Sequence, residues 1–408
     1  MQLQEGDAEP EPFSFSTERA PENRARCWLT WTTPETHAII RANLDRSPIY
    51  SGVIEGVGPR YCPSIETKVM TFPDKERHQL FIEPMGLSTE ELYVQGFSSS
   101  MPEEVQVRML HSVPGLEHAE IMRAAYAIEY DCIDPLELLP TLETRKVAGL
   151  YGAGQFNGSS GYEEAAVQGF AAGVNAALKI LGRPPFVLKR SEAYIGALID
   201  DLVTRGTNEP YRMMTSRSEY RLLLRQDNAD ERLTRIGYEL GLVSKERIAD
   251  VEAKYAAVSA ELERLERTHV SPKPELGAAL EALGTAAPVS GVSLAALLRR
   301  PQVGYDDLAP FDADRPPLPR AVTQQVEIRL RYEGYIKRQL RQVEEFAHME
   351  SRALPADIDY EKVPGLRTEA RQKLAALRPE SFGRASRISG VSPADMAALA
   401  MYIGRASR

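Results

Sequence analysis

The segment GLYGAGQFNGSSGYEEAAVQG, residues 149–169, decides how this sequence folds. Glycine is dense in its first half, and a helix-like run with an acidic pair, Glu163 and Glu164, follows. Glycine-rich turns that lead into a helix bring backbone N–H groups against a phosphate or a flat cofactor. The segment therefore predicts one wall of a cofactor site, at the start of a helix that begins near Gly161.

The spacing of these glycines leaves a second interpretation open. From Gly152 to Gly158 it follows the pattern G-x-G-x-x-x-G, which misses the dinucleotide fingerprint by one residue. A dinucleotide fold begins with a strand that runs into a complete fingerprint, and no such unit precedes the segment. An ordinary tight turn between two elements is therefore the alternative.

The composition of the chain limits the classes of protein to consider. It has 408 residues, 43% of them hydrophobic, and a formal net charge of −9. This charge argues against non-specific nucleic-acid binding but leaves a local basic patch open. Three scattered cysteines and six histidines without a paired spacing predict no disulfide framework and no metal site. No apolar run is long enough to span a bilayer, and residues 1–24 resemble no targeting peptide, so we expect a cytoplasmic protein.

The pattern of short elements predicts an α/β front half and an all-α back half. Short β-rich pieces lie at 26–32, 49–57, 68–72 and 78–84, and a strand is expected within 119–133. The period of the apolar residues in 101–116 predicts an amphipathic helix. From residue 191 onward the patterns are mainly helical, apart from an irregular stretch at about 271–319 that contains one short helix.

A second candidate site lies in the segment GVIEGVGPRYCPSIETKVMTF, residues 52–72. Cys62 follows a Gly/Pro turn, with Arg60 two residues before it and Lys68 six residues after it. A nearby cation stabilises a thiolate and makes a cysteine a better nucleophile. The alternative is a small buried core residue, which is the most common fate of a free cysteine.

Two further stretches are rich in arginine. In residues 209–235 the arginines Arg212, Arg217 and Arg221 alternate with Tyr211 and Tyr220. Arginine binds phosphates in a bidentate manner and aromatic rings stack on unpaired bases, so this pattern is typical of RNA contact. The alternative is a salt-bridged surface. The basic tail, residues 382–408, suits a protein or RNA contact, with packing within a helical bundle as its alternative.

Taken together, these stretches resemble one family, the glucose-inhibited division protein A family, also called MnmG. The likeness rests on NLDRSPIYSGVIEGVGPRYCPSIETKV, AIEYDCIDP, the glycine-rich segment, EPYRMMTSRSEYRLLLRQDNAD and ASRISGVSP, in the order of the family. It extends from about Phe13 to the end. The family begins with an FAD-binding Rossmann half that nothing here matches, so we expect the C-terminal two-thirds of such a protein, inactive alone.

The resemblance implies a role for individual residues. Cys62 matches the family's catalytic cysteine. Gln155 matches a flavin contact, within a turn that also includes Gly152, Gly154, Asn157, Gly158 and Gly161. The NAD(H) contacts implied are Gly58, Pro59, Arg60, Tyr61, Cys62, Pro63, Ser64, Ile65, Glu66, Lys68, Val69 and Phe72. The tRNA contacts implied are Arg60, Lys68, Arg212, Arg217 and Arg221.

The resemblance also implies a domain order and partners. We expect a leader at 1–24, a β-rich NAD-contact region at 25–95, and the end of a partial Rossmann-like FAD-binding domain at 96–190. A helical tRNA-contact region at 191–322 and a partner-docking helical domain at 323–408 follow. The family works as a homodimer with an MnmE-type GTPase and modifies C5 of the wobble uridine of tRNA, using FAD, NADH and methylenetetrahydrofolate.

Two other functions stay open from the sequence. One is a non-catalytic adaptor that binds tRNA or the GTPase. The other is the related folate- and FAD-dependent tRNA uridine methyltransferase, which is shorter and lacks the long helical tail that begins here at Thr323. A flavin fold without its first strands also predicts exposed apolar surface.

Overall fold

A computed structural model describes residues 1–408 except 9, 18–21, 55, 57–62 and 407–408. The chain divides into two compact units by its internal contacts. Unit 1 comprises residues 1–177 and 206–212, and unit 2 comprises residues 178–205 and 213–408. The five-part division expected from the sequence stays a prediction.

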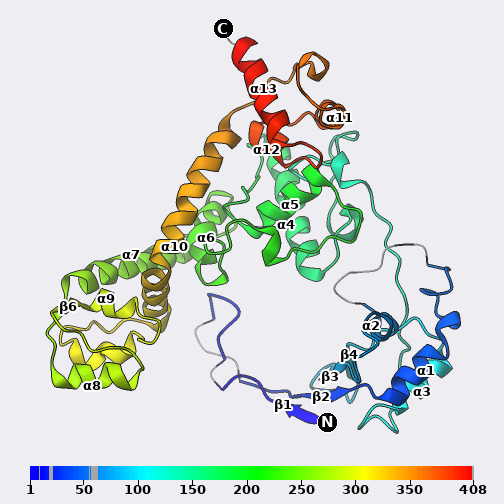
Figure 1. The fold of residues 1–408 in the computed structure, drawn as a ribbon, viewed down its shortest axis with the longest axis horizontal. Helices are drawn as coiled ribbons and strands as arrows, with labels where there is room; N and C mark the ends of the chain where they lie inside the picture. Colours follow the sequence, from blue (N-terminus) through cyan, green and yellow to red (C-terminus); the bar gives the residue numbers. More distant parts are fainter. Residues whose placement is uncertain (9, 18–21, 55, 57–62, 407–408) are drawn as a thin grey trace. The chain divides into compact units, whose positions relative to one another are not determined.

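The N-terminal part of unit 1 contains a four-stranded antiparallel sheet with the strand order β1-β2-β3-β4 (Figure 1). Its strands are β1 (Gln2–Gln4), β2 (Cys27–Trp31), β3 (Gln79–Pro84) and β4 (Leu92–Gln95). Leu29 of β2 pairs with Phe81 of β3, and Ile82 pairs with Val94 of β4. Side chains alternate along β3, so that Leu80 and Ile82 are buried beneath the sheet.

Three helices pack with this sheet around one core: α1 (Pro34–Arg41), α2 (Ile65–Thr71) and α3 (Glu103–His111). Helix α1 begins with a capping box, in which the Thr33 side chain accepts from the backbone N–H of Thr36. The predicted amphipathic helix is confirmed as α3, with its apolar face on the core through Val105 and Met109.

The rest of unit 1 is mostly irregular until α4 (Tyr162–Ile180). Two short 3-10 turns, η2 (Pro135–Glu137) and η3 (Gly154–Asn157), interrupt it. The helix predicted after Gly161 is confirmed. The strand expected within 119–133 is wrong, because this stretch joins no ladder. The Gln106 side chain instead donates to the backbone carbonyl of Ala125 and accepts from its N–H.

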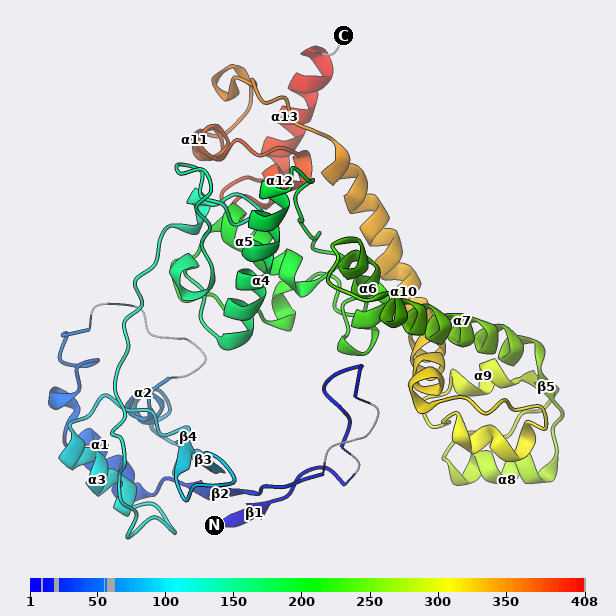
Figure 2. The ribbon, with the colours of Figure 1, turned by 180° about the vertical axis from the view of Figure 1, so that it is seen from behind.

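Unit 2 is almost entirely helical, which confirms the expected all-α back half. It contains α5 (Tyr194–Arg205), η4 (Thr215–Arg217), η5 (Gln226–Asn228), α6 (Ala229–Glu239), α7 (Lys245–Arg267), α8 (Pro274–Ala282), α9 (Leu294–Leu298), η6 (Asp306–Phe311) and α10 (Arg320–Ser351). A two-stranded sheet, β5 (His269–Val270) and β6 (Val292–Ser293), lies beside α9. Helices α7, α8, α9 and α10 share one apolar core, and Figure 2 shows α7 and α10 crossing there.

The C-terminal part of unit 2 forms a small bundle with its own core. It consists of η7 (Tyr360–Lys362), α11 (Thr368–Leu377), α12 (Phe382–Arg387) and α13 (Pro393–Ala406). Leu374 and Leu399 are fully buried at its centre. Helix α12 also packs against α10 and α5, so the bundle is joined to the rest of unit 2. Along the described residues, no helix combines the length and apolarity that crossing a membrane requires.

Two of the expected β-rich pieces are wrong. Residues 68–72 belong largely to α2, because Ser64 caps that helix and Ile65 and Val69 are buried in the core on one helical face. Residues 49–54 form turns and a bend rather than a strand. The irregular stretch at 271–319 also contains α8, which the sequence patterns did not predict.

Candidate functional site

The glycine-rich turn is closed around one buried side chain, Asn157. An added Cβ on Gly152 would stand 2.2 Å from the Asn157 Oδ1 atom, so a larger residue there would force the buried Asn157 side chain to move. Gly158 adopts φ +78° and ends η3, in a left-handed conformation that side chains disfavour. The turn therefore has a fixed shape that two glycines make possible.

A network of buried polar groups supports this turn from inside. The Asn157 Nδ2 atom donates to Gln168 Oε1 at 2.8 Å, Gln168 Nε2 donates to Ser159 Oγ at 2.7 Å, and Ser159 Oγ donates to the Gly154 carbonyl at 2.9 Å. The side chain of Asn157 is fully buried, and its Oδ1 atom accepts no hydrogen bond from the described residues. Gln155, in contrast, is exposed and donates to the Asp131 carbonyl at 2.9 Å.

The structure brings the start of the arginine-rich stretch to the same turn. Tyr211 pairs with the turn through its backbone, because its N–H donates to the Gly158 carbonyl and its carbonyl accepts from Ser160 N–H, each at 2.8 Å. Arg212 Nε lies 3.4 Å from a carboxylate oxygen of Glu164, which is buried in the first turn of α4. One candidate RNA residue therefore also braces the candidate cofactor turn.

The first turn of α4 carries negative charge at a helix end that favours anions. Glu164 occupies that position from inside, and Glu163 and Tyr162 are exposed beside it. A carboxylate at a helix N-terminus takes the electrostatic role that a bound phosphate takes in a dinucleotide loop. The turn is therefore better suited to an uncharged ring than to a pyrophosphate.

One face of α4 is apolar and exposed. Tyr162 and Phe170 are 93% and 46% exposed, and Ala166 lies between them on the same face. Gly169 and Gly173 have open space where a Cβ would stand. The sequence analysis predicted exposed apolar surface, and this face is an example of it. Because helices bury their apolar faces in folded domains, it is a candidate contact surface.

Only part of the cysteine segment is described. Gly58, Pro59, Arg60, Tyr61 and Cys62 lie outside the described residues. The remaining predicted NAD(H) contacts lie at the start of α2 and along it: Pro63, Ser64, Ile65, Glu66, Lys68, Val69 and Phe72.

The side chains of α2 divide between the core and the surface. Ile65, Glu66 and Val69 are buried, whereas Phe72 is 54% exposed. Lys68 Nζ donates to the Gly96 carbonyl at 3.0 Å. The side chains that face the core stabilise α2 itself. Contact with a nicotinamide nucleotide therefore stays a prediction, and the exposed end of the helix at Phe72 is the part best placed to make it.

Glu66 is a buried carboxylate that sequence reasoning did not single out as a structural centre. Its Oε1 atom accepts from the N–H and the hydroxyl of Ser100, both at 2.8 Å, and Ser100 Oγ lies 2.7 Å from Ser47 Oγ. Ser47 lies before residues 57–62 in the chain, and Glu66 lies after them. This network therefore joins described residues on either side of 57–62 through Ser100.

The arginines of residues 213–235 fall into two classes. Arg225 and Arg232 are held by neighbours, since Arg225 pairs with Asp227 and Arg232 donates to Asn228 Oδ1. Arg221, in contrast, is exposed and makes no ion pair within the described part of the chain. The alternative of a salt-bridged surface thus holds for Arg225 and Arg232, whereas Arg221 is available to a ligand.

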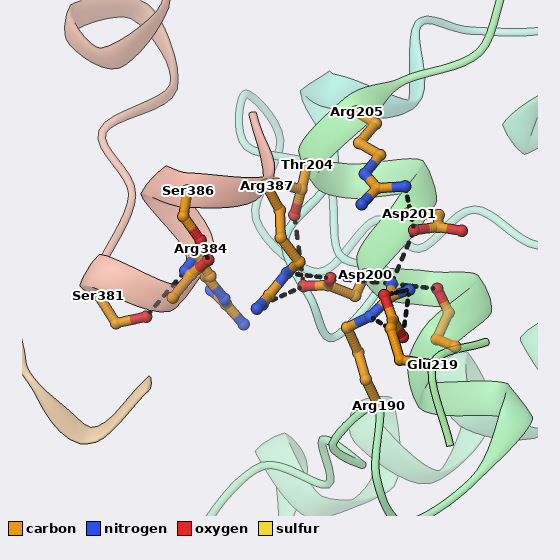
Figure 3. Close-up of polar contacts among 12 residues, drawn as sticks. Arg190, Asp200, Asp201, Thr204, Arg205, Glu219, Ser381, Arg384, Ser386 and Arg387 are labelled. Atoms are coloured by element: carbon orange, nitrogen blue, oxygen red, sulfur yellow. Dashed lines mark hydrogen bonds and ion pairs between the residues drawn. The ribbon is translucent and has the colours of Figure 1, made fainter. Parts of the chain in front are cut away.

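An ionic cluster that the sequence patterns missed holds the front of this stretch (Figure 3). Arg190 is 5% exposed, and its guanidinium donates to Asp201 at 2.7 Å and Asp200 at 3.2 Å, both on α5. It also donates to Glu219 at 2.9 Å and to the Arg217 carbonyl at 3.1 Å. Burial opposes the charge, but the three carboxylates outweigh it and raise the pKa of Arg190 above its ordinary value.

Sequence profiles of three related domains match this chain. Residues 1–184 match "Glucose inhibited division protein A", residues 245–340 match the "tRNA modifying enzyme MnmG/GidA C-terminal helical domain", and residues 342–408 match the "tRNA modifying enzyme MnmG/GidA C-terminal helical bundle". The chain belongs to the MnmG/GidA family. The family resemblance drawn from the sequence is confirmed.

Individual members of the MnmG/GidA family are similar along the whole chain. The tRNA uridine 5-carboxymethylaminomethyl modification enzyme MnmG of Caldicellulosiruptor saccharolyticus is 56% identical over 408 residues, and that of Bacillus subtilis is 54% identical over 402. They share 100% and 98% of this chain, which spans 65% and 64% of their own lengths. The Aquifex aeolicus GidA structure in its form II crystal has a TM-score of 0.87 at 46% identity, and it covers 99% of this chain and 64% of its own.

Proposed function

We propose that this chain is the tRNA-binding and flavin-completing part of an enzyme that adds a (carboxymethyl)aminomethyl group to C5 of the wobble uridine of tRNA. The observation that carries the proposal is the 56% identity, along the entire chain, with a relative named for uridine modification of tRNA. The matches of 245–340 and 342–408 to MnmG/GidA helical domains favour it over the methyltransferase alternative.

The glycine-rich turn fits the uncharged ring system of FAD. Gln155 presents an exposed amide, whereas Asn157 supports the turn from beneath and Gly152 leaves room for it. The carboxylate of Glu164 at the start of α4 disfavours a pyrophosphate at that end. Bound FAD would supply redox chemistry to this reaction, with NADH as its reductant. The chain's own residues shape and orient one wall of the ring pocket.

Cys62 is the proposed nucleophile toward the uridine. Its thiolate adds to C6 of the uracil ring, and the electron pair of the C5–C6 double bond moves to make C5 nucleophilic. C5 then bonds to the methylene carbon of methylenetetrahydrofolate as one bond from that carbon to a folate nitrogen breaks, and an incoming amine displaces the second folate nitrogen. C5 loses its proton, the thiolate leaves from C6, and tetrahydrofolate is released. Arg60 stabilises the thiolate through its charge. We assign NAD(H) contact to the same segment, residues 58–72.

We assign two further surfaces to contacts with other proteins. The exposed face of α4 is the contact for the portion of the family protein that this chain does not match. The C-terminal bundle is the proposed contact for the MnmE-type GTPase, the protein acts as a homodimer, and its location is the cytoplasm. A non-catalytic adaptor that binds tRNA and the GTPase is the second candidate, favoured by the arginine-rich stretch and the self-contained bundle core.

Binding of a tRNA transcript tests the RNA part of the proposal. Arg221→Glu weakens binding and lowers the dependence of log affinity on log salt by about one, as expected for one lost phosphate contact. Arg235→Glu is the matched control, because Arg235 is a surface arginine that pairs with Glu252. Equal effects of the two changes would show that Arg221 contacts no phosphate.

Quenching of flavin fluorescence tests the cofactor part. Stoichiometric binding of FAD by the chain, weakened by Gln155→Ala, supports a flavin wall at residues 152–161. If the chain quenches no flavin fluorescence, alone or mixed with the N-terminal portion of the Bacillus subtilis relative, the adaptor function holds instead. In that mixture, Cys62→Ser abolishes uridine modification while tRNA affinity stays unchanged.

A further inference from the structure

The Arg190 cluster joins three segments of unit 2 that are far apart in the sequence. Arg190 binds the Arg217 carbonyl and Glu219 with one guanidinium nitrogen, and Asp200 and Asp201 of α5 with another. On the other side of the Asp200 carboxylate, Arg387 of α12 forms an ion pair with it, with Nε 2.7 Å from Oδ2. Figure 3 shows the Asp200 carboxylate between the two arginines.

Asp200 is therefore shared between the bundle and the arginine-rich stretch. Its Oδ2 atom accepts from Arg190 at 3.2 Å and faces Arg387, while its Oδ1 atom accepts from Arg387 at 3.1 Å. The side chains of Arg190, Asp200 and Arg387 are only 6%, 12% and 16% exposed. In such a weakly solvated site, moving one charge changes the energy of the others.

The contacts of Arg190 fix the position of the backbone next to the candidate RNA-binding arginines. Its bonds to Arg217 and Glu219 lie on either side of Ser218, two to four residues before Arg221. Gln339 of α10 holds the next residues, because its amide accepts from Leu222 N–H and donates to the Glu219 carbonyl, each at 3.2 Å. Arg221 thus projects from a backbone that is fixed from two directions.

We propose that Asp200 and Arg387 are positioning residues through which the C-terminal bundle sets the placement of the RNA-binding arginines. The bundle holds Asp200 by Arg387, Asp200 holds Arg190, and Arg190 holds residues 217–219. This inference rests on the proposed RNA contact at Arg217 and Arg221. Its consequence is reciprocal coupling, because a ligand that shifts the bundle changes RNA affinity, and RNA changes affinity for that ligand.

The direction in which one substitution changes RNA affinity separates a positioning role from a simple electrostatic effect. Asp200→Asn removes a negative charge, so charge alone predicts tighter binding of a tRNA transcript. The positioning role predicts weaker binding, by about fivefold or more, the lower range of coupling between sites. Arg387→Gln gives a similar loss. Arg384→Gln is its matched control on α12, since Arg384 pairs with Glu380 and not with the cluster. It removes the same charge from the same helix without breaking the connection, so the positioning role predicts that it changes affinity by less than about twofold.

Two further measurements complete the test. The double variant Asp200→Asn, Arg387→Gln binds no more weakly than either single variant, because both break one connection. Hydrogen exchange at residues 215–222 becomes faster in Arg387→Gln but not in Arg384→Gln, without RNA present. Tighter binding by Asp200→Asn, additive losses, or unchanged exchange overturns the proposal. If the unmodified chain binds no tRNA, the proposed function fails, and hydrogen exchange alone decides whether the bundle positions this segment.

Discussion

Replacing Arg190 with methionine removes a cation that lies 2.7 Å from a carboxylate oxygen of the buried Asp201. Methionine has a similar length and no charge, so the change tests the ionic contacts rather than packing volume. Asp201 is 2% exposed, and the other arginine near it, Arg205, is farther away, with its nitrogen at 3.6 Å. The carbonyls of Ala197 and Arg217 also lose their Arg190 donors.

The expected loss follows from which partners are buried. Removing one member of a buried ion pair costs about 3–5 kcal/mol, because the remaining charge lies unpaired in a poorly solvated site. Asp201 is in that class. Asp200 keeps Arg387 and adds little. Glu219 is 44% exposed, so its share is that of a surface pair, about 1 kcal/mol or less. We therefore expect Arg190→Met to lower the free energy of unfolding of unit 2 by about 3–5 kcal/mol.

Urea unfolding with two probes separates the two units. Both tryptophans of the chain, Trp28 and Trp31, lie in unit 1, so tryptophan fluorescence reports on that unit. Far-ultraviolet circular dichroism reports mainly on the helices, most of which belong to unit 2. Arg190→Met shifts the circular dichroism transition to lower urea and leaves the fluorescence transition in place.

Two variants make this result decisive. Arg235→Met breaks the exposed pair with Glu252 and lowers stability by about 1 kcal/mol or less. Arg190→Met combined with Asp201→Leu regains part of the loss, because an apolar pair replaces the stranded charge. Equal, small shifts for Arg190→Met and Arg235→Met would falsify the view that this cluster stabilises unit 2.

Two pH effects are also expected. Burial and the neighbouring His78 lower the pKa of His37, and burial and Lys68 lower that of His78, so the folded state favours their neutral forms. Unit 1 therefore loses stability as pH falls below about 6.5, because the histidines of the unfolded chain take up protons at a higher pH than those of the folded chain. We expect His78→Gln to make the melting temperature of unit 1 less dependent on pH in that range. The hydrogen bond from Arg367 outweighs burial and lowers the pKa of Asp395, so the bundle loses stability only as pH falls below about 4. Asp395→Asn lowers its melting temperature at neutral pH and removes that acid dependence.

Local patterns predicted the elements whose cores are built from neighbouring residues. Helix α3 is one example, because Val105 and Met109 recur at helical spacing and face one core. Residues 68–72 are the opposite case. Val69 and Phe72 favour strands by composition, but the Ser64 cap and the burial of Ile65 impose a helix. Propensity is a weak guide where a cap and tertiary contacts agree on another structure.

The candidate sites were predictable only where their residues are contiguous. The glycine-rich turn and its following helix could be recognised from the spacing of residues 149–169. The Arg190 cluster could not, since it unites residue 190 with positions 200, 201, 219 and 387. One local signal existed, the adjacent aspartates of α5 within an otherwise apolar helix. Buried carboxylates need a cation, and the sequence does not show which of many arginines supplies it.

The extra residue in the glycine spacing has a structural counterpart. Asn157 precedes Gly158, and its side chain turns inward to Gln168 rather than outward to a ligand. The Glu164 carboxylate then takes the end of α4 where a dinucleotide loop would leave N–H groups for phosphate. Both features disfavour the binding of an anion at this turn. This supports a turn that completes a flavin ring pocket, with the pyrophosphate bound by a different part of the family protein.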